Sequence, residues 1–210
     1  MNFDFDFDRQ DRIAKRKRIL FKILRWVLVL GFTITSAWLI TEFAVEKTNM
    51  VGDSMSPTLL KDDTILVNRL AYINGTPERF DIIVFMKNGK EHSYYGIKRV
   101  IGLPGETVQI IEGVVYINGE PIEEQVNVEP IVLPGLAENP IVLDDDEYFV
   151  LGDNRNDSED SRFANIGNVV EEEIIGTAWL RTNKFGIISK LNLKSDAEEE
   201  NTEADDADNK

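Results

Sequence analysis

The stretch GIKRVIGLPGETVQIIEGVVYIN, residues 96–118, decides the fold. It contains three short runs rich in β-branched residues, and the pairs Pro104-Gly105 and Glu112-Gly113 that separate them are typical of tight turns. Further runs of this kind lie at 64–70, 81–86, 147–152 and 174–181. No long 3.6-residue period and no βαβ alternation accompany these runs, so the sequence predicts a mostly β domain.

An apolar segment precedes the β runs. Its uncharged part, Trp26 to Thr41, would span about 24 Å as a helix, and Lys22 and Arg25 can extend that span by reaching toward the membrane surface. A basic cluster at 15–18 comes before it, which by the positive-inside rule places the N-terminus in the cytoplasm. We predict a transmembrane signal-anchor helix at 19–45. A cleaved signal peptide and a buried helix of a soluble protein are the alternatives.

These features suggest four parts of the chain. Residues 1–18 form a basic cytoplasmic N-terminus, 19–45 the membrane helix, 46–190 an extracytoplasmic β domain and 191–210 a disordered acidic tail. Within the β domain, the prolines at 120–141 indicate a long irregular insertion.

Charge and composition exclude several classes of function. The net charge is −15, and because the first 25 residues carry +4, the remainder carries −19. A domain this acidic should repel a phosphate backbone, so we expect no nucleic-acid partner. The chain has no cysteine and a single histidine, His92, so it predicts neither a thiolate nor a multi-histidine metal site.

Two segments could carry a nucleophile and its base. GDSMSPTL, residues 52–59, places Ser54 beside turn-forming residues, although a linker turn with ordinary serines would look the same. KRVIGLPGE, residues 98–106, places Lys98 on the same strand face as Val100. Burial there would lower the pKa of the lysine, and a neutral amine can take the serine proton. The alternative is a strand lysine that extends to solvent.

A third segment, GDNRNDSEDSR at 152–162, is dense in short polar side chains. It could be a solvated loop. It does not fit a calcium loop, because Ser158 occupies the place of the required glycine. A Ser–His–Asp triad would need His92, which lies in the polar stretch KNGKEHSYY, so lysine is the better candidate base.

Together and in this order, the three segments behind an N-terminal anchor resemble bacterial type I signal peptidases, from the membrane helix to about Lys184. The resemblance implies two antiparallel sheets, and it identifies Ser54 as the nucleophile and Lys98 as the general base. It also implies that the Ser158 hydroxyl orients the lysine amine. Further supporting residues match at Asp153, Arg155, Asp160 and Arg162, and Arg99 is a candidate partner of Asp160.

Some family members carry an oxyanion-stabilising serine two residues before the nucleophile, where this chain has Gly52. We therefore expect the oxyanion region, Gly52 and Asp53, to use backbone N–H groups, including that of Ser54. The implied reaction removes signal peptides from secretory preproteins after small residues at −1 and −3, with no metal or organic cofactor. The implied setting is the bacterial cell membrane, with the lipid bilayer and the export machinery as further partners.

Two other readings remain open at this point. Self-cleaving repressors also use a Ser–Lys pair, but they are soluble and bind DNA. The chain could also be a membrane-tethered β domain that binds partners without enzymatic activity. In that case substitution of Ser54 or Lys98 would have no effect on chemistry.

Overall fold

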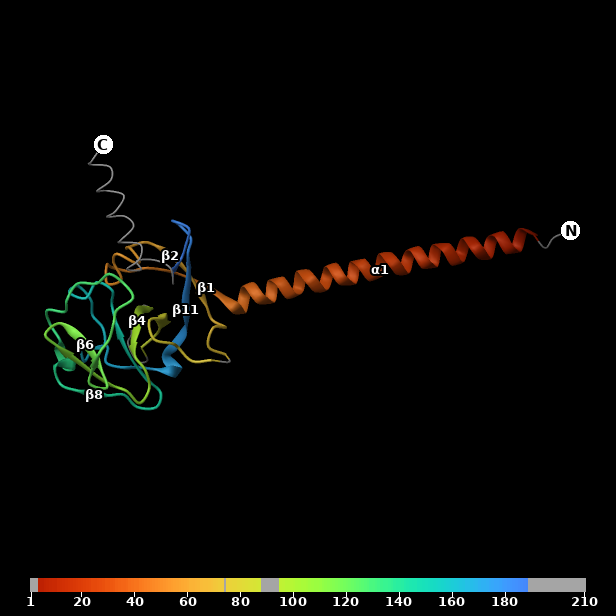
Figure 1. Cartoon of the computed structure of the whole chain (residues 1–210). Helices are drawn as coiled ribbons and strands as arrows, with labels where there is room; N and C mark the ends of the chain where they lie inside the picture. The colour runs from red at the N-terminus through yellow and green to blue at the C-terminus, as the bar shows by residue number, and fades with distance from the viewer. Residues whose placement is uncertain (1–3, 74, 88–94, 189–210) are drawn as a thin grey trace, which may run out of the picture. The chain divides into compact units, whose positions relative to one another are not determined.

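The structure is a computed structural model that describes residues 4–73, 75–87 and 95–188. The chain divides after Ala44 into a helical unit and a β unit (Figure 1). Helix α1, Asp4–Ala44, begins before the predicted segment, because residues 4–18 contain no glycine or proline that would end it. Its section Arg16–Ala44 is long and apolar enough to cross a membrane, with a mean hydropathy of 1.8 over 18 residues.

The β unit contains two sheets in which every strand pair is antiparallel. The large sheet has the order β1-β2-β11-β3-β4-β9-β10, and β12 pairs with β11. In chain order its strands are β1 (Val45–Asn49), β2 (Thr64–Asn68), β3 (Ile82–Phe85), β4 (Gly96–Gly102), β9 (Glu147–Leu151), β10 (Val169–Val170), β11 (Ile174–Arg181) and β12 (Gly186–Ile187).

The small sheet has the order β7-β6-β5-β8. Glu112-Gly113 and Asn118-Gly119 connect its hairpins, and all four residues have positive φ, between 50° and 86°, as a two-residue type I′ turn requires. Its strands are β5 (Thr107–Ile111), β6 (Val114–Ile117), β7 (Glu120–Pro121) and β8 (Ile141–Val142).

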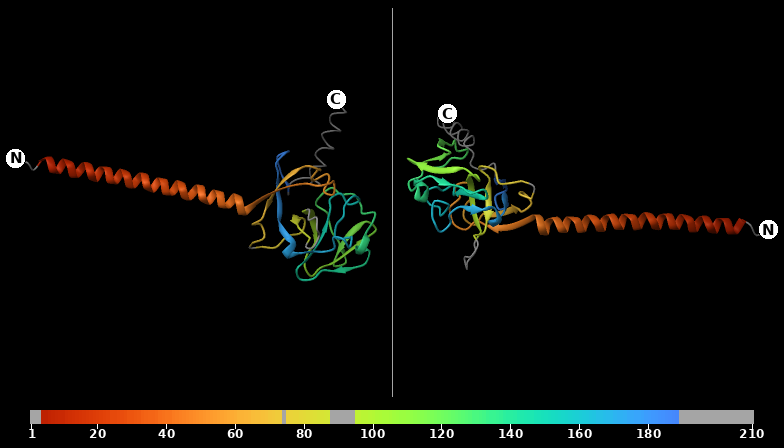
Figure 2. Two further views of the ribbon diagram at one scale, coloured as in Figure 1. Left: turned by 180° about the vertical axis from the view of Figure 1, so that it is seen from behind. Right: turned by 90° about the horizontal axis from the view of Figure 1, so that it is seen from below.

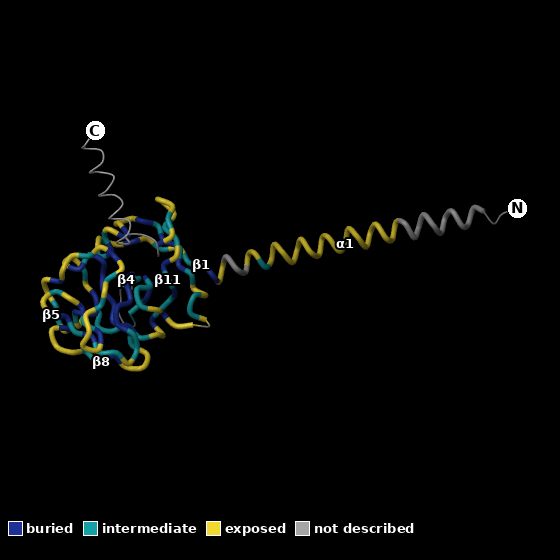
Figure 3. The backbone as a smooth tube through the Cα atoms, viewed as in Figure 1, coloured by how far each residue is buried: buried dark blue, intermediate teal, exposed yellow. Residues whose placement is uncertain are grey.

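Three hydrophobic clusters hold the β unit together. One joins the turn after β1 to one face of the large sheet through Met55 and Leu59. A second joins the two sheets through Ile101, Val108 and Phe149, and the third covers the opposite face of β3, β4 and β9. Figure 3 shows this buried interior, whereas the described side chains of α1 are almost all exposed.

The prediction of a mostly β fold with two antiparallel sheets and an N-terminal helix is confirmed. Each of the seven predicted runs contains one strand. The segment 120–141, predicted to be irregular, holds β7, the start of β8 and the 3-10 helix η1 (Gly135–Glu138), and it buries Val126, Ile131 and Ala137. A second 3-10 helix, η2 (Glu171–Glu173), precedes β11. His92 and the acidic tail at 191–210 lie outside the described residues.

Candidate active site

Ser54 lies on a turn that its neighbours anchor in the core. Met55 and Leu59 are fully buried, and the Leu59 N–H donates to Met55 O at 2.9 Å. Gly52, two residues earlier, has φ +78°, a left-handed conformation that favours glycine. Ser54 itself is half-buried.

Lys98 extends from the middle of β4, where only 7% of the residue is exposed. The strand register places Lys98 opposite Ile83, and Ile83 packs in one hydrophobic cluster with Val100. Lys98 and Val100 therefore lie on the same face of the sheet, as predicted. Burial lowers the pKa of Lys98 from 10.5 to about 8, against the opposing effect of nearby acidic side chains, of which Asp160 has the largest. An appreciable fraction of this lysine is therefore neutral near neutral pH.

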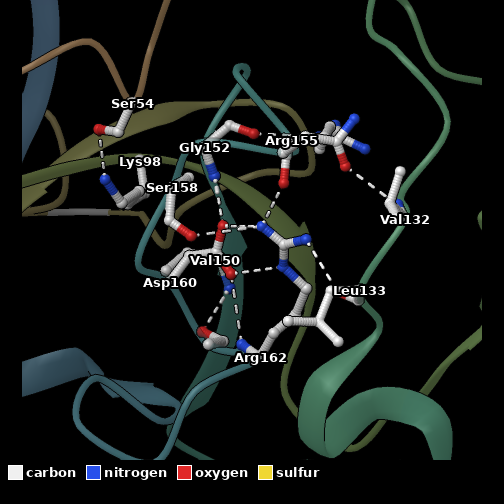
Figure 4. A network of polar contacts seen from close by, with 12 residues as sticks. Ser54, Lys98, Val132, Leu133, Val150, Gly152, Arg155, Ser158, Asp160 and Arg162 are labelled. Atoms are coloured by element: carbon white, nitrogen blue, oxygen red, sulfur yellow. Dashed lines mark hydrogen bonds and ion pairs between the residues drawn. The ribbon is translucent and has the colours of Figure 1, made fainter.

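The two side chains meet. Lys98 Nζ and Ser54 Oγ lie 2.6 Å apart, the distance of a hydrogen bond (Figure 4). When the amine is neutral, it can accept the hydroxyl proton, which is the first requirement for an activated serine.

The third polar segment holds the Ser54 backbone. The Asn154 N–H donates to Ser54 O at 3.1 Å. Gly152 makes this approach possible, because a Cβ there would lie 2.4 Å from Ser54 O and 2.2 Å from Ser158 Oγ. A side chain at residue 152 would therefore push the segment away from the serine.

The ion pairs around the site differ in one respect from the expectation. Arg99 does not pair with Asp160. It forms a bidentate pair with Asp153, with Nε–Oδ1 at 2.7 Å and Nη2–Oδ2 at 2.6 Å. The reason is the sheet register: Arg99 lies opposite Leu151, so its side chain reaches the residue two positions further along. The Thr58 hydroxyl also donates to Asp153 at 2.5 Å, which ties the turn that carries Ser54 to the same carboxylate.

Asp160 pairs with Arg162, also with two hydrogen bonds of 2.8 Å. Both side chains are at most 2% exposed. Asp160 accepts the Gly152 N–H at 3.1 Å, and Arg162 Nη2 donates to Arg155 O at 2.7 Å. This pair therefore fixes the loop that supports Ser54, as Figure 4 shows.

Ser158 lies in the same region of Figure 4 as Lys98 and Ser54. Its hydroxyl oxygen is buried, but within the described residues it makes no hydrogen bond. The predicted contact between this hydroxyl and the lysine amine is therefore not formed in this structure.

The predicted oxyanion region, Gly52 and Asp53, leads directly into the nucleophile turn. The Ser54 N–H donates to no group within residues 4–73, 75–87 and 95–188, so it remains available to a developing oxyanion. In the same ranges, no cluster of three or more His, Cys, Asp or Glu side chains could hold a metal ion.

Sequence reasoning missed three contributions to this site: Thr58, Gly152 and the Asn154 N–H. All three lie inside the polar segments already singled out. Their roles depend on contacts between segments about 95 residues apart, which spacing along the chain does not reveal.

Comparisons with known proteins show the family to which the chain belongs. The family described as "Signal peptidase, peptidase S26" matches residues 23–182. "Signal peptidase I" of Leptolyngbya laminosa is 39% identical over 174 residues, which cover 78% of this chain and 83% of that protein. "Signal peptidase I S" of Bacillus subtilis (strain 168) is 32% identical over 201 residues, which cover 88% of this chain and 100% of that protein.

Among solved structures, a signal peptidase I from Enterococcus faecalis V583 matches with 32% sequence identity and a TM-score of 0.37, over 49% of this chain and 96% of that chain. The family match spans all three polar segments that meet around Ser54 and Lys98. The chain therefore belongs to the signal peptidase family, peptidase S26.

Proposed function

We propose that this protein removes signal peptides from exported preproteins with Ser54 as nucleophile and Lys98 as general base. The observation that carries the assignment is the 2.6 Å separation of Ser54 Oγ and a buried amine whose pKa is lowered to about 8. Family membership supports the substrate class, since a signal peptidase acts on preproteins.

The reaction begins when neutral Lys98 takes the Ser54 hydroxyl proton and Oγ attacks the carbonyl carbon before the cut. The Ser54 N–H donates to the resulting oxyanion. The protonated lysine then gives its proton to the leaving amine, the peptide C–N bond breaks, and an acyl-enzyme remains. Lys98 next deprotonates a water, which attacks the ester, and the returning proton restores the Ser54 hydroxyl.

The membrane helix supports the same substrate. The section Arg16–Ala44 can span a bilayer, and the basic cluster at 15–18 favours a cytoplasmic N-terminus and an extracytoplasmic β unit. A signal peptide also has an apolar segment that resides in the bilayer. Anchoring enzyme and substrate in one membrane raises their effective concentration.

Two preproteins that differ only at the cut test the proposal. The first carries alanine at −1 and −3, and the second carries phenylalanine at −1. The full-length protein in detergent is expected to cut the first after the −1 alanine, identified by the mass of the product. We expect kcat/KM for the second to be lower by roughly 100-fold, because the proposed specificity requires a small side chain at −1. Equal rates, or a cut at another bond, would contradict the proposed specificity.

A further inference from the structure

Asn154 contacts both peptide groups that flank the nucleophile. Its side-chain amide Nδ2 donates to Asp53 O at 3.2 Å, and its main-chain N–H donates to Ser54 O at 3.1 Å. The side-chain contact joins segments 101 residues apart in the chain, which carry the orange and the blue-green of the colour scale in Figure 2. One residue of the loop at 152–162 therefore holds two successive carbonyls of the nucleophile turn.

The contact with Asp53 O determines the direction of the Ser54 N–H. The two groups belong to one peptide unit, which is planar and trans, so the C=O and N–H bonds point in opposite directions. Asp53 O also accepts the Ser56 N–H at 3.0 Å. Ser56 belongs to the same turn and moves with it. The Asn154 amide, in contrast, ties this peptide unit to a separate loop of the β unit.

The direction of this N–H matters because it is free for an oxyanion. Among the residues that the structure describes, no group accepts a hydrogen bond from the Ser54 N–H. Gly52 has no side chain that could add a donor to the turn. A hydrogen bond weakens steeply as its angle departs from linear, and one oxyanion donor contributes about 10²–10³ in rate. A rotation of the Asp53–Ser54 peptide unit would therefore lose part of that contribution.

The backbone that carries the Asn154 amide is itself held in place. Asp153 before it and Arg155 after it both form ion pairs, and their side chains are at most 2% exposed. The Asp157 N–H donates to Asn154 O at 3.1 Å, which closes a turn at this residue. Asn154 thus has a fixed position from which its amide can orient the peptide unit of the nucleophile.

We propose that Asn154 is a positioning residue for the oxyanion: its side-chain amide holds the Asp53–Ser54 peptide unit so that the Ser54 N–H points at the carbonyl oxygen that becomes charged during attack. Asn154 acts on the reacting atoms only through this peptide unit. The inference rests on the proposed function, because it takes Ser54 as the nucleophile.

Asn154→Ala tests the inference, because it removes the amide and keeps the main-chain N–H that donates to Ser54 O. The substrate is the preprotein with alanine at −1 and −3, cut by the full-length protein in detergent. We expect kcat to fall roughly tenfold with KM unchanged, since the weakened hydrogen bond forms fully only in the transition state. The loss is smaller than that of a whole donor because the Ser54 N–H remains and Ser56 still contacts Asp53 O.

Two inhibitors with the sequence that precedes the cut separate positioning from a general loosening of the site. With a peptide aldehyde, Ser54 Oγ bonds to the aldehyde carbon, the hydroxyl proton passes to Lys98, and the aldehyde oxygen becomes an oxyanion. The corresponding peptide alcohol binds without this step. Asn154→Ala is expected to raise the inhibition constant of the aldehyde roughly tenfold and to leave that of the alcohol unchanged. A change in both constants, or in neither, would overturn the inference.

Asn156→Ala is the matched control, because it removes the same kind of amide from the same loop. The Asn156 side chain contacts Glu129, Pro130 and Val132. Its kcat should stay within about twofold of wild type. An equal loss in both variants would assign the effect to the loop as a whole and would reject the role of Asn154.

Ser54→Ala distinguishes failure of this inference from failure of the proposed function. Cleavage of the same bond by Ser54→Ala would reject the nucleophile and, with it, the proposed function. An inactive Ser54→Ala beside a fully active Asn154→Ala would reject only the role of Asn154.

Discussion

Ser54→Ala is expected to lower preprotein cleavage by at least about 10⁴-fold, the scale of loss when a serine protease loses its nucleophile. The Ser54 hydroxyl lies 2.6 Å from the Lys98 amine, and its removal leaves no oxygen at that position to form the acyl-enzyme. Because the residue is half-buried and its backbone is held by Asn154, the fold should persist. The measurement is kcat/KM on the preprotein, with far-UV circular dichroism to check the fold.

Thr107→Ala serves as the matched control, because it removes a half-buried hydroxyl from β5 of the small sheet. Its activity should stay within a few-fold of wild type. If Ser54→Ala still cut the same bond at an appreciable rate, another group would have to be the nucleophile.

Lys98→Met is expected to abolish activity and to raise stability. Loss of a general base alone costs about 10²–10⁴ in rate, and loss of the proton donor to the leaving amine adds to that. Methionine keeps most of the side-chain length without a charge, so the fold should tolerate it. Activity is measured as for Ser54→Ala, and stability as the free energy of unfolding of the full-length protein in detergent.

The stability gain follows from the depressed pKa. In the folded protein the pKa of Lys98 is about 8, against a normal value of 10.5, so between these values the unfolded chain binds more protons. The free energy of unfolding of the wild type therefore rises with pH across this window. Below pH 8 the burial of the charged amine lowers that free energy by the full amount, roughly 3 kcal/mol. Lys98→Met should be more stable than wild type by up to that amount at pH 7, and the difference should shrink toward pH 10.5. A variant that is less stable at pH 7 would contradict the burial of a charged amine.

Much of the fold could be predicted from the sequence, because the strand-forming runs and turn pairs act locally. The Asn118-Gly119 turn is a clear instance, because asparagine and glycine both tolerate the positive φ that a type I′ turn requires. In the Glu112-Gly113 turn only the glycine favours that conformation. Strands of two residues, such as β7 and β10, were not predicted. They exist because long-range pairing aligns them, and two residues carry too little pattern to detect.

The segment 120–141 shows a second limit. Its prolines indicate irregular backbone, and they do so correctly for much of its length. They give no indication that Val126, Ile131 and Ala137 become buried or that Glu124 meets Arg155. Such contacts depend on how the segment packs against the loop at 152–162.

At the site, the sequence placed Ser54 and Lys98 in separate segments, and the structure brings them together. The partners of the arginines were harder to predict. Asp153 and Asp160 lie in one loop with Arg155 and Arg162. Charge alone does not show which arginine pairs with which aspartate. The register of β4 against β9 assigns Arg99 to Asp153, and proximity in the chain assigns Arg162 to Asp160.

The most direct test of the Ser54–Lys98 dyad is the pH dependence of the rate at which an activated acyl ester labels the full-length protein, with the labelled residue identified by mass spectrometry. We expect a single label on Ser54, at a rate that rises about tenfold per pH unit at low pH and levels off above about pH 8, where Lys98 is neutral. A label on another residue, or a rate at Ser54 that does not follow a group with a pKa near 8, would contradict the dyad.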